Sequence, residues 1–192
     1  MLTKEQFKII VPHISNKNLD IYLPLLNKTM PDNKIVTKER QACFIAQIAH
    51  ESGSFQYTEE LASGKAYEGR KDLGNIQPGD GVKFKGHGLI QVTGRTNHEL
   101  CSLFLYGDRR LLDNPKLITL PPDSLYSAYW FWNEYKNLNI ICDQPDDWKH
   151  EWKGRTYTKF EWLTVKINGG LNGYDDRFAF YQRAKEVFKL AA

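Results

Sequence analysis

Cysteine is scarce in this sequence, which has three in 192 residues. Cys43, Cys101 and Cys142 cannot all pair within one chain, and no two of them stand at CxxC spacing. A disulfide framework and a cysteine-based zinc site are therefore not expected, and the pattern is typical of a reducing compartment. We interpret Cys43, which lies within a helical pattern, as a packing residue rather than a nucleophile.

Long hydrophobic runs are also missing. No apolar stretch approaches the roughly 20 residues that a transmembrane helix needs. The charged residues Lys4, Glu5 and Lys8 stand where a signal peptide would have its apolar core. We therefore expect a protein that is made soluble in the cytoplasm and does not insert stably into membranes.

Several catalytic motifs are absent or incomplete. His50 and Glu51 open like the HExxH pattern of zinc proteases, but Ser54 stands where the second histidine would be. The sequence has neither a GxSxG elbow nor a GxxxxGKS/T phosphate loop, and its five histidines show no metal-ligand spacing. We expect neither a metal nor another cofactor.

A strong charge of one sign is absent as well, because the net charge is +3. Residues 149–192 hold nine Lys or Arg against five Asp or Glu. This mildly basic end suits an anionic polymer such as a bacterial wall, although a solvated helix face explains most of these side chains better. The feature is too weak to predict a nucleic-acid partner.

The apolar residues that are present recur mostly at helical spacing, which predicts one mainly α domain over residues 1–192. Residues 1–36 read as a helical scaffold, with a capping box at Thr3 and Gln6 and a second helix from Ser15. Beyond residue 60 we expect an irregular loop (62–84) and a short extended segment (84–97). A helix with a mostly buried aromatic stripe (124–135) and a polar loop (143–151) should follow. The chain should end with a helix (159–167) and a final helix after residue 173.

A helix over residues 38–52, with Thr37 as its N-cap, places Glu51 in the last turn before Ser52-Gly53-Ser54. A carboxyl group there faces the negative end of the helix dipole, which favours the protonated form that a general acid needs. An isolated glutamate at a helix end is more often simply solvated.

A second carboxylate, Glu60, follows nine residues after Glu51. In a continuous helix the two would lie on opposite faces, so they can meet one substrate only if the chain turns between them. With that turn, their separation could fall near the roughly 6.5 to 9.5 Å of inverting glycosidases, which leaves room for a water. Glu68 and, less favoured, Glu59 are alternatives to Glu60 as the base.

Three ordered motifs together resemble glycoside hydrolase family 19, which contains chitinases and many bacteriophage endolysins. They are HESGSF at 50–55 with Glu60, GHGLIQVTGRTN at 86–97, and INGG at 167–170 with Arg177. The resemblance runs from about residue 38 to 189. It implies a lysozyme-like, two-lobed helical domain with a central cleft, a minor extended element and no separate wall-binding domain.

The resemblance also implies roles for individual residues. Glu51 would be the general acid, Glu60 the base and Thr93 the hydroxyl residue that positions the attacking water. The nine-residue offset of Glu60 matches the short-loop bacterial members. Residues expected to contact substrate or to lie beside the carboxylates are Gln91, Asn97, Asn168, Arg177 (an ion-pair partner), Tyr67 and Glu68, the last two in a segment resembling the endolysin branch (67–75).

Gly94-Arg95 stands where many chitinases have a bulkier, aromatic-containing sequence, which favours peptidoglycan over chitin as the substrate. The predicted activity is therefore inverting hydrolysis of the β-1,4 bond between N-acetylmuramic acid and N-acetylglucosamine, by a monomer. The resemblance implies a phage or prophage endolysin that reaches the wall through a holin-like pore. A chitinase and a catalytically silent glycan-binding module are the alternatives.

Overall fold

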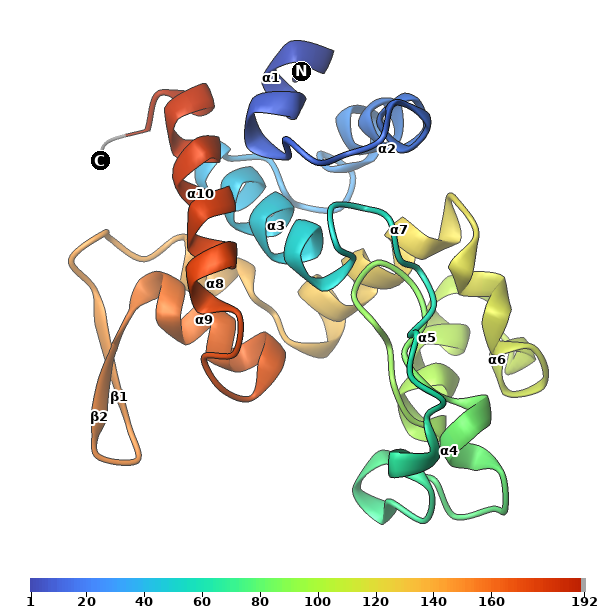
Figure 1. Cartoon of the computed structure of the whole chain (residues 1–192). Coiled ribbons are helices and arrows are strands. Elements are labelled where there is room, and N and C mark those ends of the chain that lie inside the picture. The colour runs from blue at the N-terminus through green and yellow to red at the C-terminus, as the bar shows by residue number, and fades with distance from the viewer. Residues whose placement is uncertain (191–192) are drawn as a thin grey trace. The chain divides into compact units, whose positions relative to one another are not determined.

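The computed structural model describes residues 1–190 of the chain and is mainly helical (Figure 1). Within that range the strands form one two-stranded sheet. The predicted mainly α fold is confirmed. The chain divides into two compact units, one of Met1–His50 with the described part of Trp132–Ala192, the other of Glu51–Phe131. Among the described residues, none of the helices combines the length and the apolarity that crossing a membrane requires.

Up to residue 190, the first unit contains six α-helices. The helices are α1 (Lys4–Ile10), α2 (Asn16–Thr29), α3 (Lys38–Glu51), α8 (Asn139–Cys142), α9 (Lys159–Asn168) and α10 (Tyr174–Phe188). Side-chain caps formed by Thr3, Ser15 and Thr158 begin α1, α2 and α9, and the first two of these caps confirm the sequence prediction. The cap at Thr37 is also confirmed, because its Oγ1 accepts from the Arg40 N–H at 3.1 Å.

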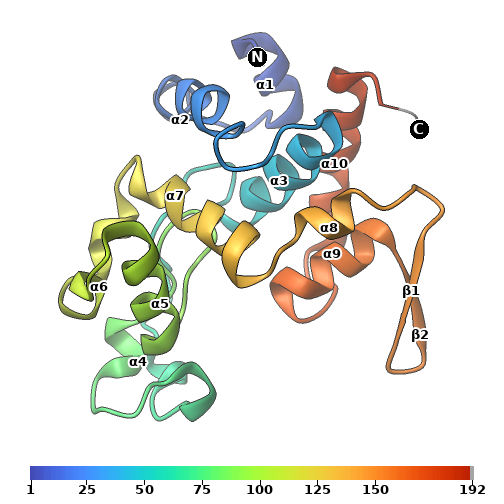
Figure 2. The ribbon, with the colours of Figure 1, turned by 180° about the vertical axis from the view of Figure 1, so that it is seen from behind.

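Helix α3 runs through the middle of this unit, with α1 and α2 on one side and α8 and α9 on the other (Figures 1 and 2). All eight residues from Ala42 to Ala49 are buried, so the helix is covered on every side rather than amphipathic. A helix in that position must satisfy any polar side chain internally. Gln47 is the one it carries in this stretch, and its partners are described below with the site.

The aromatic segment differs from the single helix expected over residues 124–135. Helix α7 (Asp123–Tyr129) gives way to a π-helical segment, η4 (Trp130–Tyr135). Trp132 is fully buried and donates from Nε1 to Asn139 Oδ1 at 2.9 Å. The interpretation of most of this stripe as core is confirmed.

The sheet lies where the sequence was read as a loop. Strands β1 (Lys149–Trp152) and β2 (Arg155–Thr158) form an antiparallel hairpin in which His150 faces Tyr157. The loop prediction is therefore wrong for residues 149–151. Lys153 and Gly154 both have positive φ, as a two-residue hairpin turn of this kind requires. The strands are largely polar and exposed, so hydrophobic alternation gave no signal.

The second unit is built from short helices and turns. The expected extended segment at 84–97 is present only as isolated bridges, from His87 to Glu59 and to Val92. Asn97 is helical rather than extended. The elements of this unit are η1 (Lys65–Tyr67), η2 (Lys71–Leu73), α4 (Asp80–Lys83), α5 (Arg95–Tyr106), α6 (Arg110–Asp113), η3 (Pro115–Thr119) and α7.

Candidate active site

Glu51 is the last residue of α3 and the first of the second unit. The chain turns sharply after it, because Gly53, Ser54 and Phe55 all adopt left-handed backbone angles, with φ of 55°, 63° and 65°. Such angles are costly for Ser54 and Phe55. The buried Ser52 holds this turn. Its Oγ accepts from the Phe55 N–H at 2.9 Å, and its carbonyl accepts from the N–H groups of Gln56 and Tyr57. The predicted turn between the two carboxylates is confirmed.

Glu60 has a hydrogen-bond donor on each carboxylate oxygen. The Tyr67 hydroxyl donates to Oε1 at 3.0 Å and the Gly86 N–H donates to Oε2 at 2.8 Å. The backbone is fixed as well, since the Glu60 N–H donates to the Gly86 carbonyl and Lys85 Nζ donates to the Glu60 carbonyl, both at 2.8 Å. These contacts fix the orientation of the Glu60 carboxylate. Burial, followed by the hydrogen bond to Glu60, raises the pKa of Tyr67 and keeps its phenol protonated.

The two alternative bases have other partners. Glu59 forms ion pairs with Lys85 at 3.0 Å and Lys116 at 3.1 Å. Burial opposes the charge on Glu59, but the hydrogen bonds from the two lysines lower its pKa. Glu68 accepts from the N–H groups of Gly79 and Gly81 at 2.7 and 2.8 Å, so it holds the start of α4. Both carboxylates are thus used to fix loops.

The residues expected to contact substrate in the second motif are linked to one another. Thr93 Oγ1 donates to the Gln91 carbonyl at 2.9 Å, and Asn97 Nδ2 donates to the Thr93 carbonyl at 2.8 Å. Gln91 has φ of 56° and packs over Gly86, where any side chain would lie within 2.6 Å of Gln91 Oε1. The glycine therefore lets Gln91 approach the backbone that binds Glu60.

A buried histidine pair lies behind this segment. His87 Nδ1 and His98 Nε2 are 3.0 Å apart, and His98 Nδ1 donates to the Gly94 carbonyl at 2.8 Å. Burial lowers the pKa of His87 to about 4 and that of His98 to about 3. Both rings are therefore neutral at pH 7, and the His87 backbone bridges the segments that contain Glu59 and Val92.

The loop around Tyr67 is tied down by polar contacts. Asn75 Nδ2 donates to the Tyr67 carbonyl and its Oδ1 accepts from the Arg95 N–H, both at 2.9 Å. Arg95 also pairs with the buried Asp80 at 2.5 Å, and its hydrogen bonds lower the Asp80 pKa. Arg70 also forms an ion pair with Asp72 in this loop. These contacts fix the position of the Tyr67 hydroxyl.

The third motif lies in the first unit. Arg177 is 2% exposed, and its NH1 donates to Gln47 Oε1 at 2.6 Å. Gln47 in turn donates from Nε2 to Thr164 Oγ1 at 3.1 Å. Asn168 Nδ2 and Arg177 Nε both donate to the Asn172 carbonyl, at 3.3 and 3.4 Å. The structure thus brings Asn168 and Arg177 together, and the ion pairing of Arg177 with the carboxylates stays a prediction.

Sequence reasoning missed two groups in this part of the site. Gln47 was read as one more residue of a helix, although a glutamine within the run IAQIA would have signalled a buried polar contact. The second group is His50, whose Nδ1 lies 2.7 Å from Asp176 Oδ2. A side chain at Gly173 would collide with the His50 ring at 2.2 Å, so this glycine is needed for the close contact.

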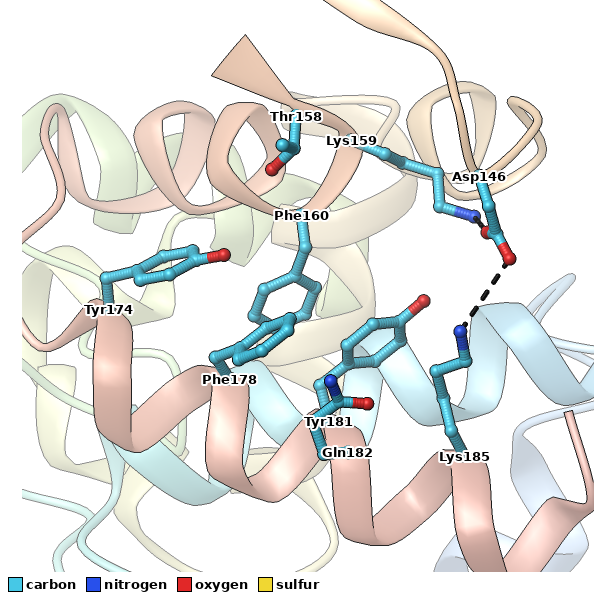
Figure 3. Close-up of a pocket in the computed structure, with 9 residues that line it drawn as sticks. All are labelled: Asp146, Thr158, Lys159, Phe160, Tyr174, Phe178, Tyr181, Gln182 and Lys185. Carbon is cyan, nitrogen blue, oxygen red and sulfur yellow. Dashed lines mark hydrogen bonds and ion pairs between the residues drawn. The ribbon is translucent and has the colours of Figure 1, made fainter. Parts of the chain in front are cut away.

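A cavity of about 270 Å³ lies in the first unit between the start of α9 and α10 (Figure 3). Its wall has an aromatic part, where Phe160 and Tyr181 stack at 4.3 Å, and a charged part. Lys159 pairs with Glu39 at 2.9 Å and with Asp146 at 2.5 Å, and Asp146 also lies 3.6 Å from Lys185. Each charged residue of the wall thus has an oppositely charged partner, and none of the predicted catalytic residues lines this cavity.

No family model matches the chain. A glycosyl hydrolase family 19 domain-containing protein from Haemophilus influenzae is 29% identical over 180 residues, covering 77% of this chain and 79% of that protein. Endochitinase At2g43610 from Arabidopsis thaliana is 36% identical over 136 residues, covering 70% of this chain and 41% of the endochitinase.

Among solved structures, chitinase C from Streptomyces griseus has a TM-score of 0.64 at 20% identity, covering 98% of this chain and 77% of that one. A family 19, class IV chitinase from Zea mays has a TM-score of 0.60 at 18% identity, covering 100% and 83%. The chain has a chitinase-like glycoside hydrolase family 19 domain. Its predicted lysozyme-like fold is confirmed, with the small sheet at 149–158.

Within this family 19 domain, residues 51–60 and 86–97 belong to the second unit and residues 167–170 to the first. The chain spans less than half the length of the Arabidopsis endochitinase.

Proposed function

We propose that this family 19 domain hydrolyses β-1,4 glycosidic bonds in polymers that contain N-acetylglucosamine, with Glu51 as general acid and Glu60 as general base. The main support is the difference between the two surroundings. Glu60 receives a donor on each oxygen, from Tyr67 and Gly86, whereas Glu51 ends α3 directly before the left-handed turn. A carboxylate that is oriented by two donors is placed to act as a base, which leaves the other carboxyl group as the acid.

In the proposed reaction, the Glu51 carboxyl group gives its proton to the glycosidic oxygen as the bond to the anomeric carbon breaks. Glu60 accepts a proton from a water that attacks the opposite face of the sugar, with the Thr93 hydroxyl helping to position that water. The product has inverted configuration, and no covalent intermediate forms. Proton exchange with solvent then returns a proton to Glu51 and removes one from Glu60.

We propose that amide side chains of the second unit hold the substrate. Gln91 and Asn97 each use their amide nitrogen within the protein, which leaves the oxygens Gln91 Oε1 and Asn97 Oδ1 to accept from an N-acetylated sugar. Asn168 is an exposed residue of the first unit beside the buried Arg177, and its role as a substrate contact rests on the resemblance to the family. The Tyr67 hydroxyl acts through Glu60. Glu68, which caps α4, supports the loop rather than the sugar.

For the polymer, we propose bacterial peptidoglycan, cut between N-acetylmuramic acid and N-acetylglucosamine. Support comes from Gly94 and Arg95, which replace a bulkier aromatic sequence, and from the basic residues after 148. The segment 67–75 supports an endolysin role, in which the enzyme reaches the wall through a separately made pore. Chitin is the competing substrate, favoured by the similarity to the endochitinase of Arabidopsis thaliana.

The deciding experiment compares wild type, Glu51→Gln and Glu60→Gln on purified peptidoglycan and on chitin oligomers, with mass analysis of the products. Loss of an acid or base should lower the rate by about 10² to 10⁴. Glu59→Gln is the matched control, because it removes a neighbouring carboxylate that fixes a loop, and we expect it to keep most of the activity.

New reducing ends from peptidoglycan with wild type alone would support the proposal, and α-configured products would support inversion. Turnover of chitin oligomers without turnover of peptidoglycan would assign a chitinase. Equal rates for wild type and Glu51→Gln on both substrates would contradict the assignment of the acid. Wall binding without hydrolysis by any variant would leave the silent glycan-binding module.

A further inference from the structure

The five tryptophans of the chain fall into two groups. Trp130 and Trp132 are 4% and 0% exposed and belong to the core. Trp148, Trp152 and Trp162 instead gather where the β1–β2 hairpin meets α9, and none of them is buried. Trp152 is 37% exposed. Figures 1 and 2 show that the hairpin projects from the rest of its own unit beside α9.

The rings form a continuous row. His150 stacks on Trp148 at 5.6 Å and lies 3.9 Å from Trp162, whose ring is 5.6 Å from that of Trp152. Tyr157 lies behind them, 5.7 Å from Trp162, and is buried. Trp162, His150 and Tyr157 hold the hairpin against α9, which a two-stranded hairpin needs in order to be stable. Trp152 lies at the outer end of this row and keeps 37% of its surface exposed, with the Lys153 ammonium group over its ring.

Positive charges surround this row. Lys153 Nζ lies 4.4 Å from the centre of the Trp152 ring, and Lys166 Nζ lies 5.8 Å from that of Trp162. Arg155 is balanced by Glu161 at 3.0 Å. Within residues 1–190, no carboxylate forms an ion pair with Lys153 or Lys166, so both cations are available to an anionic ligand.

We propose that Trp152 and Trp162, with Lys153 and Lys166, form a surface that binds a carboxylate-bearing amino-sugar polymer outside the catalytic residues. The identity of the polymer rests on the proposed function. The apolar face of a pyranose ring fits an exposed indole, because stacking buries apolar surface on both sides while the hydroxyl groups stay in water. Carboxylates on the glycan or its peptides would meet the two lysines.

This surface, called here the tryptophan hairpin, would give the domain a second binding site for its insoluble substrate. A second attachment raises the local concentration of polymer without any new contact at the reacting bond. Charge complementarity distinguishes the proposed ligand from a neutral one, since chitin could use only the ring contacts.

The test uses Glu51→Gln protein, so that no hydrolysis occurs, and measures retention on purified peptidoglycan and on chitin. Adding Trp152→Ala should weaken retention on peptidoglycan about tenfold, which corresponds to about 1.4 kcal/mol. Trp152→Phe keeps a ring and should retain most of the binding. Phe104→Ala is the matched control, because Phe104 is an aromatic residue of the other unit that is 50% exposed.

A double variant, Lys153→Gln with Lys166→Gln, separates the charge from the rings and guards against a Trp152→Ala protein that fails to fold. It should lower retention on peptidoglycan severalfold at low salt and leave retention on chitin unchanged. Unchanged retention on peptidoglycan for the Trp152→Ala and lysine variants alike, or no retention of the parent, would overturn the proposal. So would equal binding of the parent to vesicles of phosphatidylglycerol.

The hydrolysis assay on wild type is independent of this binding measurement. Failure to turn over peptidoglycan would count against the proposed function and would leave the retention result standing. Conversely, wild type could hydrolyse peptidoglycan normally while Trp152→Ala leaves retention unchanged. That result would contradict only the proposed binding role of the tryptophan hairpin.

Discussion

Glu59 and Glu60 are neighbours in the chain, yet their side chains meet different chemistry. Two lysines form ion pairs with Glu59, whereas the Glu60 carboxylate accepts hydrogen bonds from a phenol and a backbone N–H. A base that is oriented by neutral donors can still accept a proton, while an ion-paired one must first lose a partner. The Tyr67 hydroxyl is therefore the contact most open to test.

We expect Tyr67→Phe to lower kcat about tenfold with little change in KM, because it removes one hydrogen bond to a charged group and leaves the ring in place. The measurement is steady-state hydrolysis of a soluble oligosaccharide. Tyr106→Phe serves as the control, since Tyr106 also donates to a carboxylate, Asp123, at 2.6 Å. If the two variants lost equal activity, the contact to Glu60 would have no special role.

Because His87 and His98 are buried, we expect the free energy of unfolding to fall with pH already above the pH range in which most carboxylates titrate. Their folded pKa values, about 4 and about 3, are lower than the ordinary value of 6.5. The unfolded chain therefore binds protons first, and stability falls as the pH drops from 6.5 through the folded values. By pH 5 each ring should cost about 2 kcal/mol of unfolding free energy.

Urea unfolding at pH 7.5 and pH 5 measures this loss. The comparison stays above most of the carboxylate titration, so acidic groups with lowered pKa contribute little. A free energy of unfolding that is equal at the two pH values would show that the two rings are not held neutral by the fold.

At the scale of elements, the turn after α3 decides where the second carboxylate goes. Three successive residues with left-handed backbone angles turn the chain sharply after the helix ends. The side chain and carbonyl of Ser52 hold these angles. A local strain of this kind persists because the surrounding contacts over-determine it.

Gly53→Ala should lower the unfolding free energy by about 1 to 2 kcal/mol and reduce activity. A methyl group there would sit at a φ of 55° and 2.8 Å from the Tyr57 ring. Thermal unfolding and oligosaccharide hydrolysis would measure the two effects. Gly154→Ala has a similar φ in the hairpin turn and open space around it, so it should destabilise the fold without altering kcat.

At the scale of the whole molecule, the charge is weak in total and uneven along the chain. The net charge is +3, with the excess of basic residues after residue 148. Exposed charges of this kind act over about one Debye length, near 8 Å at physiological ionic strength. They should assist contact with an anionic wall and be indifferent to a neutral polymer.

Raising the salt concentration from about 50 to 300 mM should therefore slow peptidoglycan hydrolysis severalfold and leave chitin-oligomer hydrolysis nearly unchanged. Initial rates on the two substrates at matched pH provide the measurement. Equal salt dependence on both substrates would mean that the basic residues do not contribute to substrate choice.

Helix caps and the turn between Glu51 and Glu60 could be predicted from the sequence because each depends on residues close together in the chain. Thr3, Ser15 and Thr37 cap helices through neighbours three residues away, and Ser52 to Ser54 form a local turn. The hairpin at 149–158 and the π-helical segment at 130–135 were missed. Their stability comes from packing against α9 and the core, which local patterns do not report.

The sequence by itself determined a mainly helical fold, the end of α3 at Glu51 and the turn toward Glu60, because backbone propensity and capping act over a few residues. Only the tertiary structure decided what each carboxylate meets: Tyr67 and Gly86 for Glu60, two lysines for Glu59, and the N–H groups that start α4 for Glu68. The same holds for Gln47, whose partners Arg177 and Thr164 lie more than a hundred residues away. Such contacts depend on which buried groups the fold brings within hydrogen-bonding distance, and residue order alone does not specify that.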